Sequence, residues 1–213
     1  MIMEAEALHS PVLRQKAVYM MTLPGLINCG RAGPYRVGTW NVDSLAGRSG
    51  ELVEALAERR MDVACVQETR WRGSGCRFFG AIGRRYKLFW MGRKAKSDGV
   101  GIFVAEKWVD SVVSVGRHSE RVLVLKMVLG DCLLNVFTVY APHSRKPDDE
   151  KETFGNEVFH LVTCIPQNEM VVFAGDMNGH IGSSNVGYGG TMVVLATALG
   201  TLMVSGYWSL QMG

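Results

Sequence analysis

The sequence lacks the signatures of several protein classes. Its five cysteines form no C-x-x-C pair, which favours buried free thiols in a reducing compartment. Met1 to Ala7 carry two Glu and begin no uninterrupted apolar region, so we expect no signal peptide. The longest apolar stretch, Thr191 to Val204, is too short to span a bilayer. These absences predict an intracellular protein that does not bind a membrane.

Acidic residues are absent from one stretch of the chain. Between Arg70 and Lys96 there are nine Lys/Arg and no Asp/Glu, and aromatic residues are interleaved with them. Because the whole chain carries +3, the remainder sums to about −6. One interpretation is a DNA-backbone contact surface, and the other is a solvated strand face whose aromatics fill the core. The first interpretation proposes six basic contacts: Arg70, Arg72, Arg84, Arg85, Lys94 and Lys96.

Length and composition predict one sizeable domain or one domain with tails. The chain has 213 residues, 47% of them hydrophobic, which excludes low-complexity disorder as its main state. Residues 1–34 show no sustained period and are interrupted by prolines and glycines, so we expect an irregular extension there. The domain should cover residues 35–190, and an atypical apolar tail should cover residues 191–213.

Hydrophobic patterns within the domain predict strands interleaved with helices. We expect helices over 51–60, with Ser49 as its cap, and over 149–163. Gly130-Asp131 predicts a hairpin turn. Hairpins need antiparallel neighbours and β-α-β units need parallel ones, so we expect an α/β fold of two packed mixed sheets flanked by helices. The expected strands cover 35–42, 62–67, 86–91, 99–105, 111–115, 121–129, 132–140 and 170–174.

Four short motifs follow strand-like runs: Thr39-Trp40-Asn41-Val42, Gln67-Glu68-Thr69, Tyr140-Ala141-Pro142 and Gly175-Asp176-Met177-Asn178. Each motif alone is typical of a strand end or a turn. Ligands of layered α/β folds gather where strands give way to loops, so these side chains could converge on one rim. Hard oxygen ligands suit Mg²⁺, which needs only one or two carboxylates. Together the motifs predict a site for a metal and a phosphate.

Phosphodiester hydrolysis suggests a candidate role for each polar residue of the motifs. Glu68 is the candidate metal ligand. Asp176 would activate or orient the water, and Asn41 would orient Asp176 or the phosphate. Tyr140 would donate a hydrogen bond to a phosphate oxygen or to the leaving group. Asn178, two residues after Asp176 in an extended segment, would point to the same side.

Two residues next to the motifs are further candidates. Asp43 would join the outer shell of the metal. His143 follows the third motif directly and has two readings, a residue near bound nucleic acid or a histidine of a surface loop. His180 lies close to Asp176 in the sequence, and we favour a structural role in a loop for it.

With their flanking residues, the motifs resemble those of the endonuclease/exonuclease/phosphatase superfamily, in the same order, from about residue 35 to residue 188. The chain is most similar to the apurinic-like endonuclease domains of LINE-type non-LTR retrotransposons and to the craniofacial development protein 2-like sequences derived from them. The resemblance implies a four-layer α-β-β-α sandwich, Mg²⁺ or Mn²⁺ at one rim, DNA as partner and a nuclear location. It implies no obligate protein partner. It also supports the roles given above for Glu68, Asp176, Asn41, Asn178 and Tyr140, with Asp43 as an outer metal contact.

The chain departs from the family pattern in one respect. A later Asp and a Ser-Asp-His motif close the family's site, and the sequence contains no Ser-Asp-His. Losing a residue that stabilises the transition state costs orders of magnitude in rate, so we expect impaired DNA cleavage. Two alternatives stay open: a non-catalytic nucleic-acid-binding remnant, and a phosphatase of the same superfamily.

The tail suggests an origin for this departure. Met192 to Gly213 contains no Lys, Arg, Asp or Glu, and a shifted reading frame can spell a segment similar to the LINE subgroup. We hypothesise that a frameshift truncated an ancestral endonuclease and left the second sheet incomplete. Sequencing the coding DNA should then reveal Ser-Asp-His codons downstream in the shifted frame. A downstream sequence without them would contradict the hypothesis.

Overall fold

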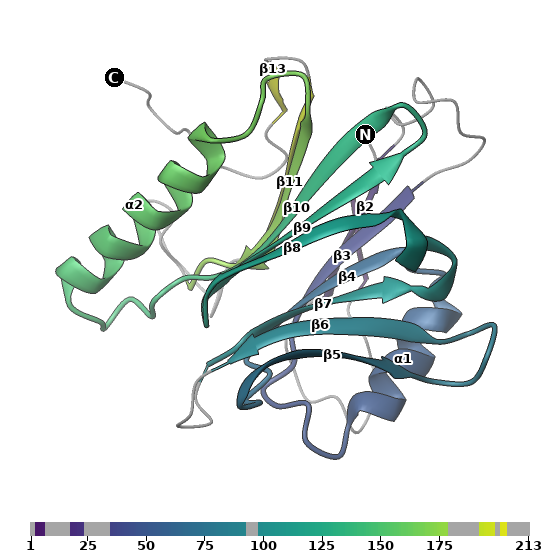
Figure 1. Ribbon diagram of the computed structural model, residues 1–213. Coiled ribbons are helices and arrows are strands. Elements are labelled where there is room, and N and C mark those ends of the chain that lie inside the picture. Colours follow the sequence, from purple (N-terminus) through teal and green to yellow (C-terminus); the bar gives the residue numbers. More distant parts are fainter. Residues whose placement is uncertain are drawn as a thin grey trace.

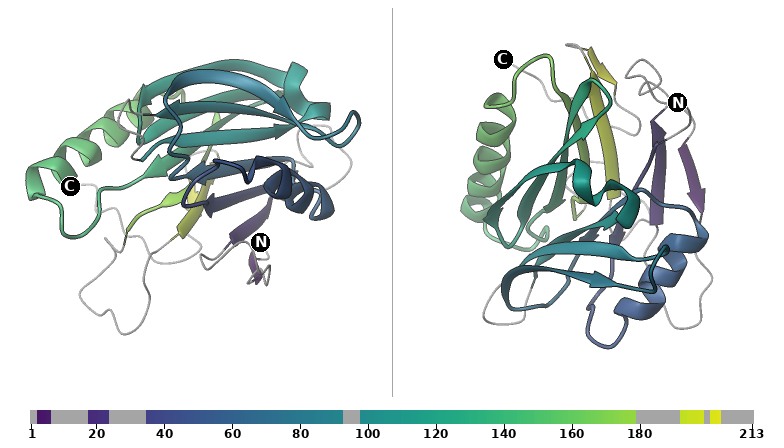
Figure 2. Two further views of the ribbon diagram at one scale, coloured as in Figure 1. Left: turned by 90° about the horizontal axis from the view of Figure 1, so that it is seen from below. Right: turned by 45° about the vertical axis from the view of Figure 1, so that its right-hand side comes forward.

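Two sheets face each other and carry one helix on each outer side (Figures 1 and 2). The computed structural model describes residues 3–6, 18–23, 35–92, 98–178, 192–198 and 201–203, with side chains for 35–92 and 98–178. Helix α1 (Ser49–Glu58) covers the first sheet and α2 (Asp148–Thr163) covers the second. The predicted α/β sandwich of four layers is confirmed. No helix in the described part of the chain is long and apolar enough to cross a membrane.

The first sheet is built around a β-α-β unit. Strands β3 and β4 are parallel and are joined through α1, whereas every other pair in this sheet is antiparallel. Helix α1 begins at Ser49 itself, and the N-cap residue is Arg48, whose side chain makes no capping hydrogen bond. The predicted capping role of Ser49 is therefore wrong. In spatial order the strands are β1 (Met3–Glu6), β2 (Val18–Leu23), β3 (Tyr35–Asn41), β4 (Val63–Gln67), β7 (Val100–Ala105), β6 (Tyr86–Gly92) and β5 (Gly73–Phe79).

The second sheet repeats this arrangement with the other helix. Strands β10 and β11 are parallel and are joined through α2. Leu129 pairs with Cys132 across the predicted Gly130-Asp131 turn, where Gly130 supplies a φ of 61°. A 3-10 helix, η2 (Glu106–Ser111), leads into the sheet. The spatial order is β13 (Thr201–Met203), β12 (Met192–Ala198), β11 (Met170–Asp176), β10 (Cys132–Tyr140), β9 (Val122–Leu129) and β8 (Val112–Ser119).

Strands also occur where the sequence reading expected none. Strand β5 was missed because it is an exposed edge strand with two glycines and no alternating pattern. Within residues 1–34, β1 and β2 extend the sheet from β3. We expected an irregular extension over this segment, and these two strands depart from that expectation. Within the tail, β12 pairs with β11 and covers its edge. These segments form strands because their backbone groups pair with the edge of an existing sheet. Their own sequences carry no strand pattern that would predict this.

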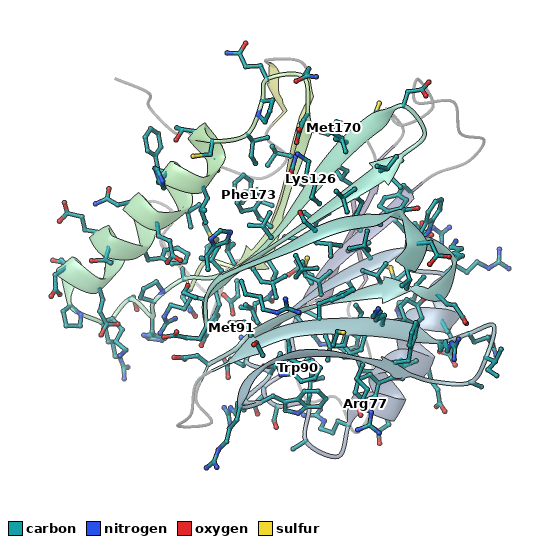
Figure 3. All side chains as sticks on the ribbon, viewed as in Figure 1. Arg77, Trp90, Met91, Lys126, Met170 and Phe173 are labelled. Carbon is teal, nitrogen blue, oxygen red and sulfur yellow. The ribbon has the colours of Figure 1, made fainter. Side chains whose placement is uncertain are left out.

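Three apolar clusters hold the layers together. The largest lies between the sheets and includes Tyr35, whose hydroxyl donates to Met127 Sδ at 3.3 Å. Another lies under α1 around Leu52 and Phe103, and the third lies under α2 around Phe137. Burial of this much apolar surface is the main stabilising contribution to such a domain. The side chains of Figure 3 fill the space between the ribbons.

The cysteines depart in part from the predicted buried free thiols. Cys65 is free and buried, and burial raises the pKa of its thiol. Cys76 and Cys164 are free but exposed, because each lies on a segment with one face to solvent. Cys132 is disulfide-bonded, so the prediction of a free thiol is wrong there.

Gly175 tests how tightly β10 and β11 are packed. A Cβ at this position would overlap the carbonyl oxygen of Val139, its partner in the ladder. Gly175→Ala should therefore destabilise the protein markedly, as measured by urea unfolding, because the backbone must shift. Gly155→Ala is the matched control: it lies in α2 with open space around it and should be neutral or stabilising by up to about 1 kcal/mol. Equal stability of the two variants would contradict this packing.

Candidate active site

The four motifs meet because of the two parallel strand pairs. Asn41 ends β3, Gln67 ends β4, Tyr140 ends β10 and Asp176 ends β11. The register places Asn41 opposite Gln67 and Tyr140 opposite Asp176. Strand β11 also lies against β3, and β10 lies against β4. The carboxyl ends of both pairs therefore share one rim of the sandwich.

Asn41 is the centre of the site. Its Nδ2 donates to Glu68 Oε1 and to Asp176 Oδ2, each at 2.8 Å. Glu68 follows the first sheet and Asp176 belongs to the second, so one amide nitrogen joins carboxylates from both sheets. Asn41 is 3% exposed and Asp176 is 2% exposed. Two carboxylates brought this close in a poorly solvated place attract a cation or a proton donor.

Tyr140 donates from its hydroxyl to the same oxygen, Glu68 Oε1, at 3.0 Å. Burial raises the pKa of the Tyr140 phenol, and the negative charge of Glu68 and this hydrogen bond raise it further. A hydrogen bond with Asn178 acts in the opposite direction but does not reverse the shift. The phenol therefore remains protonated at neutral pH and is available as a hydrogen-bond donor.

Asn178 has a different geometry from the one expected for a side chain facing a phosphate. Its backbone N–H donates to Asp176 Oδ1 at 3.0 Å, and its side-chain amide donates to the carbonyl of Ala141. The second bond joins the loop after β11 to the loop after β10, and the first fixes the Asp176 carboxylate at the end of β11. Asn178 thus holds Asp176 and the Tyr140 loop in fixed positions relative to each other.

Glu68 and Asp43 lie on either side of a cation. Arg70 Nη2 is 2.5 Å from Asp43 Oδ1 and 3.2 Å from Glu68 Oε2. One positive centre therefore reaches both carboxylates, as a metal ion would. Two carboxylates, completed by water and substrate phosphate, are the donor set that Mg²⁺ typically has in proteins. The described residues contain no group of three or more His, Cys, Asp or Glu that could hold a metal.

The loops that present these residues adopt an uncommon backbone conformation. Asp43, Glu68, Arg70 and Asn178 have φ between 49° and 56°, in the left-handed region that non-glycine residues seldom occupy. Backbone hydrogen bonds hold the loops there, including Thr69 N–H to the Gly99 carbonyl at 3.0 Å. Such strain clusters at functional sites, where the surrounding structure compensates its cost.

Two residues that support the site were not identified from the sequence. Gln67 is fully buried, and its Nε2 donates to Thr39 Oγ1 and to Thr138 Oγ1, each at 3.1 Å, which links the sheets beneath the site. Arg121 places its guanidinium 5.2 Å from the ring centroid of Tyr140 and donates to its carbonyl. An ion pair with Asp98 at 3.3 Å also holds Arg121. Gln67 lies in a predicted motif, but the motif indicates no role for it, and Arg121 belongs to no motif.

The predicted DNA-contact residues divide between two ends of the first sheet. Arg70 and Arg72 lie at the active-site end, where Gly73 pairs with Gly92. His143 is exposed on the loop after β10 at the same rim. Arg84 and Arg85 precede Tyr86, which pairs with Ala105 at the opposite end. A single surface beside the site is therefore wrong for these two arginines, because the β5–β6 hairpin carries them away from it.

The remaining candidates have no described geometry. Lys94 and Lys96 lie outside the described residues, as does His180. Their predicted roles stay predictions.

A profile of the endonuclease/exonuclease/phosphatase family matches residues 38–192, which include all four motifs. The chain belongs to this family. Craniofacial development protein 2 of Bos taurus and that of Tragulus javanicus are each 23% identical over 154 residues, or 71% of this chain. The chain spans about a quarter of their length, at 25% and 26%.

Solved structures are also similar to this chain. TDP2 of D. rerio, complexed with a single strand DNA product, has a TM-score of 0.50 and 20% identity, covering 67% of this chain and 60% of that one. An AP endonuclease from Archaeoglobus fulgidus has a TM-score of 0.49 and 23% identity, covering 68% and 57%. The profile confirms the predicted family, and the likeness to TDP2 agrees with the predicted α/β sandwich.

Removing the Asn41 amide should destabilise the fold. Asn41→Ala loses two hydrogen bonds to charged groups and leaves two neighbouring carboxylates without their shared donor, so we expect a loss of about 2–3 kcal/mol in the free energy of unfolding. Urea unfolding measures it. Asn156→Ala on the exposed face of α2 is the matched control and should change stability by less than about 0.5 kcal/mol. If Asn41→Ala were as stable as this control, the hydrogen bonds of Asn41 to Glu68 and Asp176 would contribute nothing to the stability of the fold.

Proposed function

We propose that this chain carries a divalent-metal-dependent DNA endonuclease site of retrotransposon origin, which hydrolyses phosphodiester bonds. The observation that carries the proposal is the Asn41 amide, which joins Glu68 and Asp176 across the two sheets. The TDP2 structure, complexed with single strand DNA product, supports DNA as the substrate class. The proposed origin rests on the resemblance of the four motifs to those of LINE-type endonuclease domains. A nuclear location follows from a DNA substrate and is part of the proposal.

Glu68 and Asp43 would hold Mg²⁺ or Mn²⁺ at the rim. The bound metal supplies neutralisation of the non-bridging phosphate oxygens. Arg70, which contacts both carboxylates, would have to leave them, and at 46% exposure its side chain has room to do so. Its positive charge then remains within reach of the substrate phosphate.

Asp176 is the residue best placed to accept a proton from the attacking water. Its Oδ2 accepts from Asn41 and its Oδ1 accepts from the Asn178 N–H, so both oxygens are oriented and each retains a free lone pair. A carboxylate held this way can orient a water and take its proton. Tyr140, protonated and 9% exposed, would donate to the phosphate or to the leaving oxygen.

These 213 residues contain no Ser-Asp-His sequence, so we expect slow cleavage from this stretch of chain by itself. Without a donor that stabilises the transition state, cleavage should be orders of magnitude slower than with it. The alternative is a non-catalytic nucleic-acid-binding protein, and the contact of Arg70 with both candidate metal ligands favours it. A phosphatase of the same superfamily is the third reading.

Plasmid nicking distinguishes these functions. We expect the chain to convert supercoiled DNA to the open circle in Mg²⁺, and Asp176→Ala to lower the rate by about 10²–10⁴-fold, as is typical for loss of a general base. Glu152→Ala, which removes an exposed carboxylate of α2, is the matched control and should retain the rate. Equal nicking by the chain and by Asp176→Ala would favour the non-catalytic reading. Release of phosphate from an inositol phosphate without nicking would favour the phosphatase.

Thermal stability with added Mn²⁺ tests the metal independently of activity. Metal that binds only the folded state should raise the melting temperature, and Glu68→Gln should remove the increase. The Glu152→Ala control should keep it. No increase for the unaltered chain would contradict metal binding.

A further inference from the structure

A second candidate site lies at the opposite end of the first sheet from Asn41. A cavity of about 310 Å³ opens between the end of α1, the turn before β6 and the start of η2. The seven residues of β6 separate it from the active-site rim by about 20 Å. In Figure 3, Met91 marks the active-site end of β6, and Arg77 of β5 lies nearer to α1.

The lining of this cavity is strongly basic. Arg60, Arg84, Arg85 and Lys107 contribute four cations, and Glu106 is the one carboxylate among the lining residues. Both oxygens of Glu106 are engaged, since Gly83 N–H donates to Oε2 at 3.0 Å and Arg85 Nε donates to Oε1 at 2.6 Å. Glu106 therefore compensates Arg85 and orders the turn but leaves the other cations uncompensated.

The remaining positive charge is concentrated on two arginines. Lys107 pairs with buried Asp62 at 2.6 Å. Within the described residues, neither the Arg60 nor the Arg84 guanidinium has a hydrogen-bond or ion-pair partner. The carbonyl end of α1 favours a cation at Arg60, but Arg84 lies on the turn before β6 and has no such explanation. Unpaired like charges around one cavity favour an anionic ligand.

An aromatic ring lies next to Arg85, one of the residues that line the cavity, although the ring itself is not part of the lining. Phe78 is 38% exposed, and the Arg85 guanidinium lies 4.5 Å from its ring centroid. Lys87, its partner in the β5–β6 ladder, places Nζ 5.5 Å from the same centroid. Cations over an exposed aromatic face, next to a basic groove, are how proteins bind single-stranded nucleic acid through phosphates and base stacking.

We propose that this cavity binds phosphate groups of a single nucleic-acid strand, with Arg60 and Arg84 on the phosphates and Phe78 stacking on a base. The site is separate from the proposed endonuclease site and does not depend on its activity. Arg84 and Arg85 lie a strand length from Asp176, so they cannot contact a substrate bound at the active-site rim. Binding at this cavity would give this part of the basic stretch a role.

Fluorescence anisotropy with a labelled oligothymidylate tests the proposal. Each lost phosphate contact should flatten the slope of log Kobs against log salt by about 0.7 for a single strand. Arg84→Glu should show this change, whereas Lys151→Glu on α2, an equal change of charge, should not. The same slope for both variants would overturn the proposal. If Arg84→Glu does not fold, Arg84→Gln with Arg60→Gln replaces it.

Amide chemical-shift mapping locates the binding. The oligothymidylate should shift the amides of Gly83, Arg84 and Glu106 in the unaltered chain but not in Arg84→Glu, whether or not the rim near Asn41 also responds. Phe78→Ala should weaken the oligothymidylate and leave inorganic phosphate unchanged. Shifts confined to the rim, or inorganic phosphate binding as tightly as the oligothymidylate, would overturn the proposal.

Discussion

The hydrogen bonds of Asn41 depend on the arrangement of both sheets. Its amide reaches Glu68 and Asp176 only because two parallel strand pairs end at the same rim and the sheets face each other there. A small slip of either pair would separate the three side chains, because N–H···O hydrogen bonds need a donor–acceptor distance of about 2.7–3.2 Å. The site is therefore a property of the packed sandwich, and no single motif contains it.

Buried polar groups maintain this alignment beneath the rim. Gln67 has no exposed surface and binds threonines from both sheets, so it would be left with unsatisfied polar atoms if the sheets moved apart. Above it, Asp43, Glu68 and Arg70 have left-handed backbone, and the two carboxylates both contact the Arg70 guanidinium. Stability and site geometry thus depend on the same contacts.

The two ends of the first sheet differ in chemistry. The Asn41 end gathers carboxylates around one cationic nitrogen. The Arg84 end gathers cations around one fully engaged carboxylate. The antiparallel β5–β6 hairpin produces this division, because it returns a basic run of sequence to the far end of the strands.

The sequence by itself predicted the elements that carry strong hydrophobic patterns, including the β3–α1–β4 unit and the hairpin at Gly130-Asp131. It also indicated the family, because short motifs keep their order along the chain. It did not reveal β5, which is exposed at a sheet edge, or β1 and β2, which depend on pairing with β3. Only the tertiary structure decided that Asn41 joins the sheets, that Arg121 supports Tyr140, and that the basic stretch has two ends. These facts depend on contacts between residues far apart in sequence, whose energies no local pattern records.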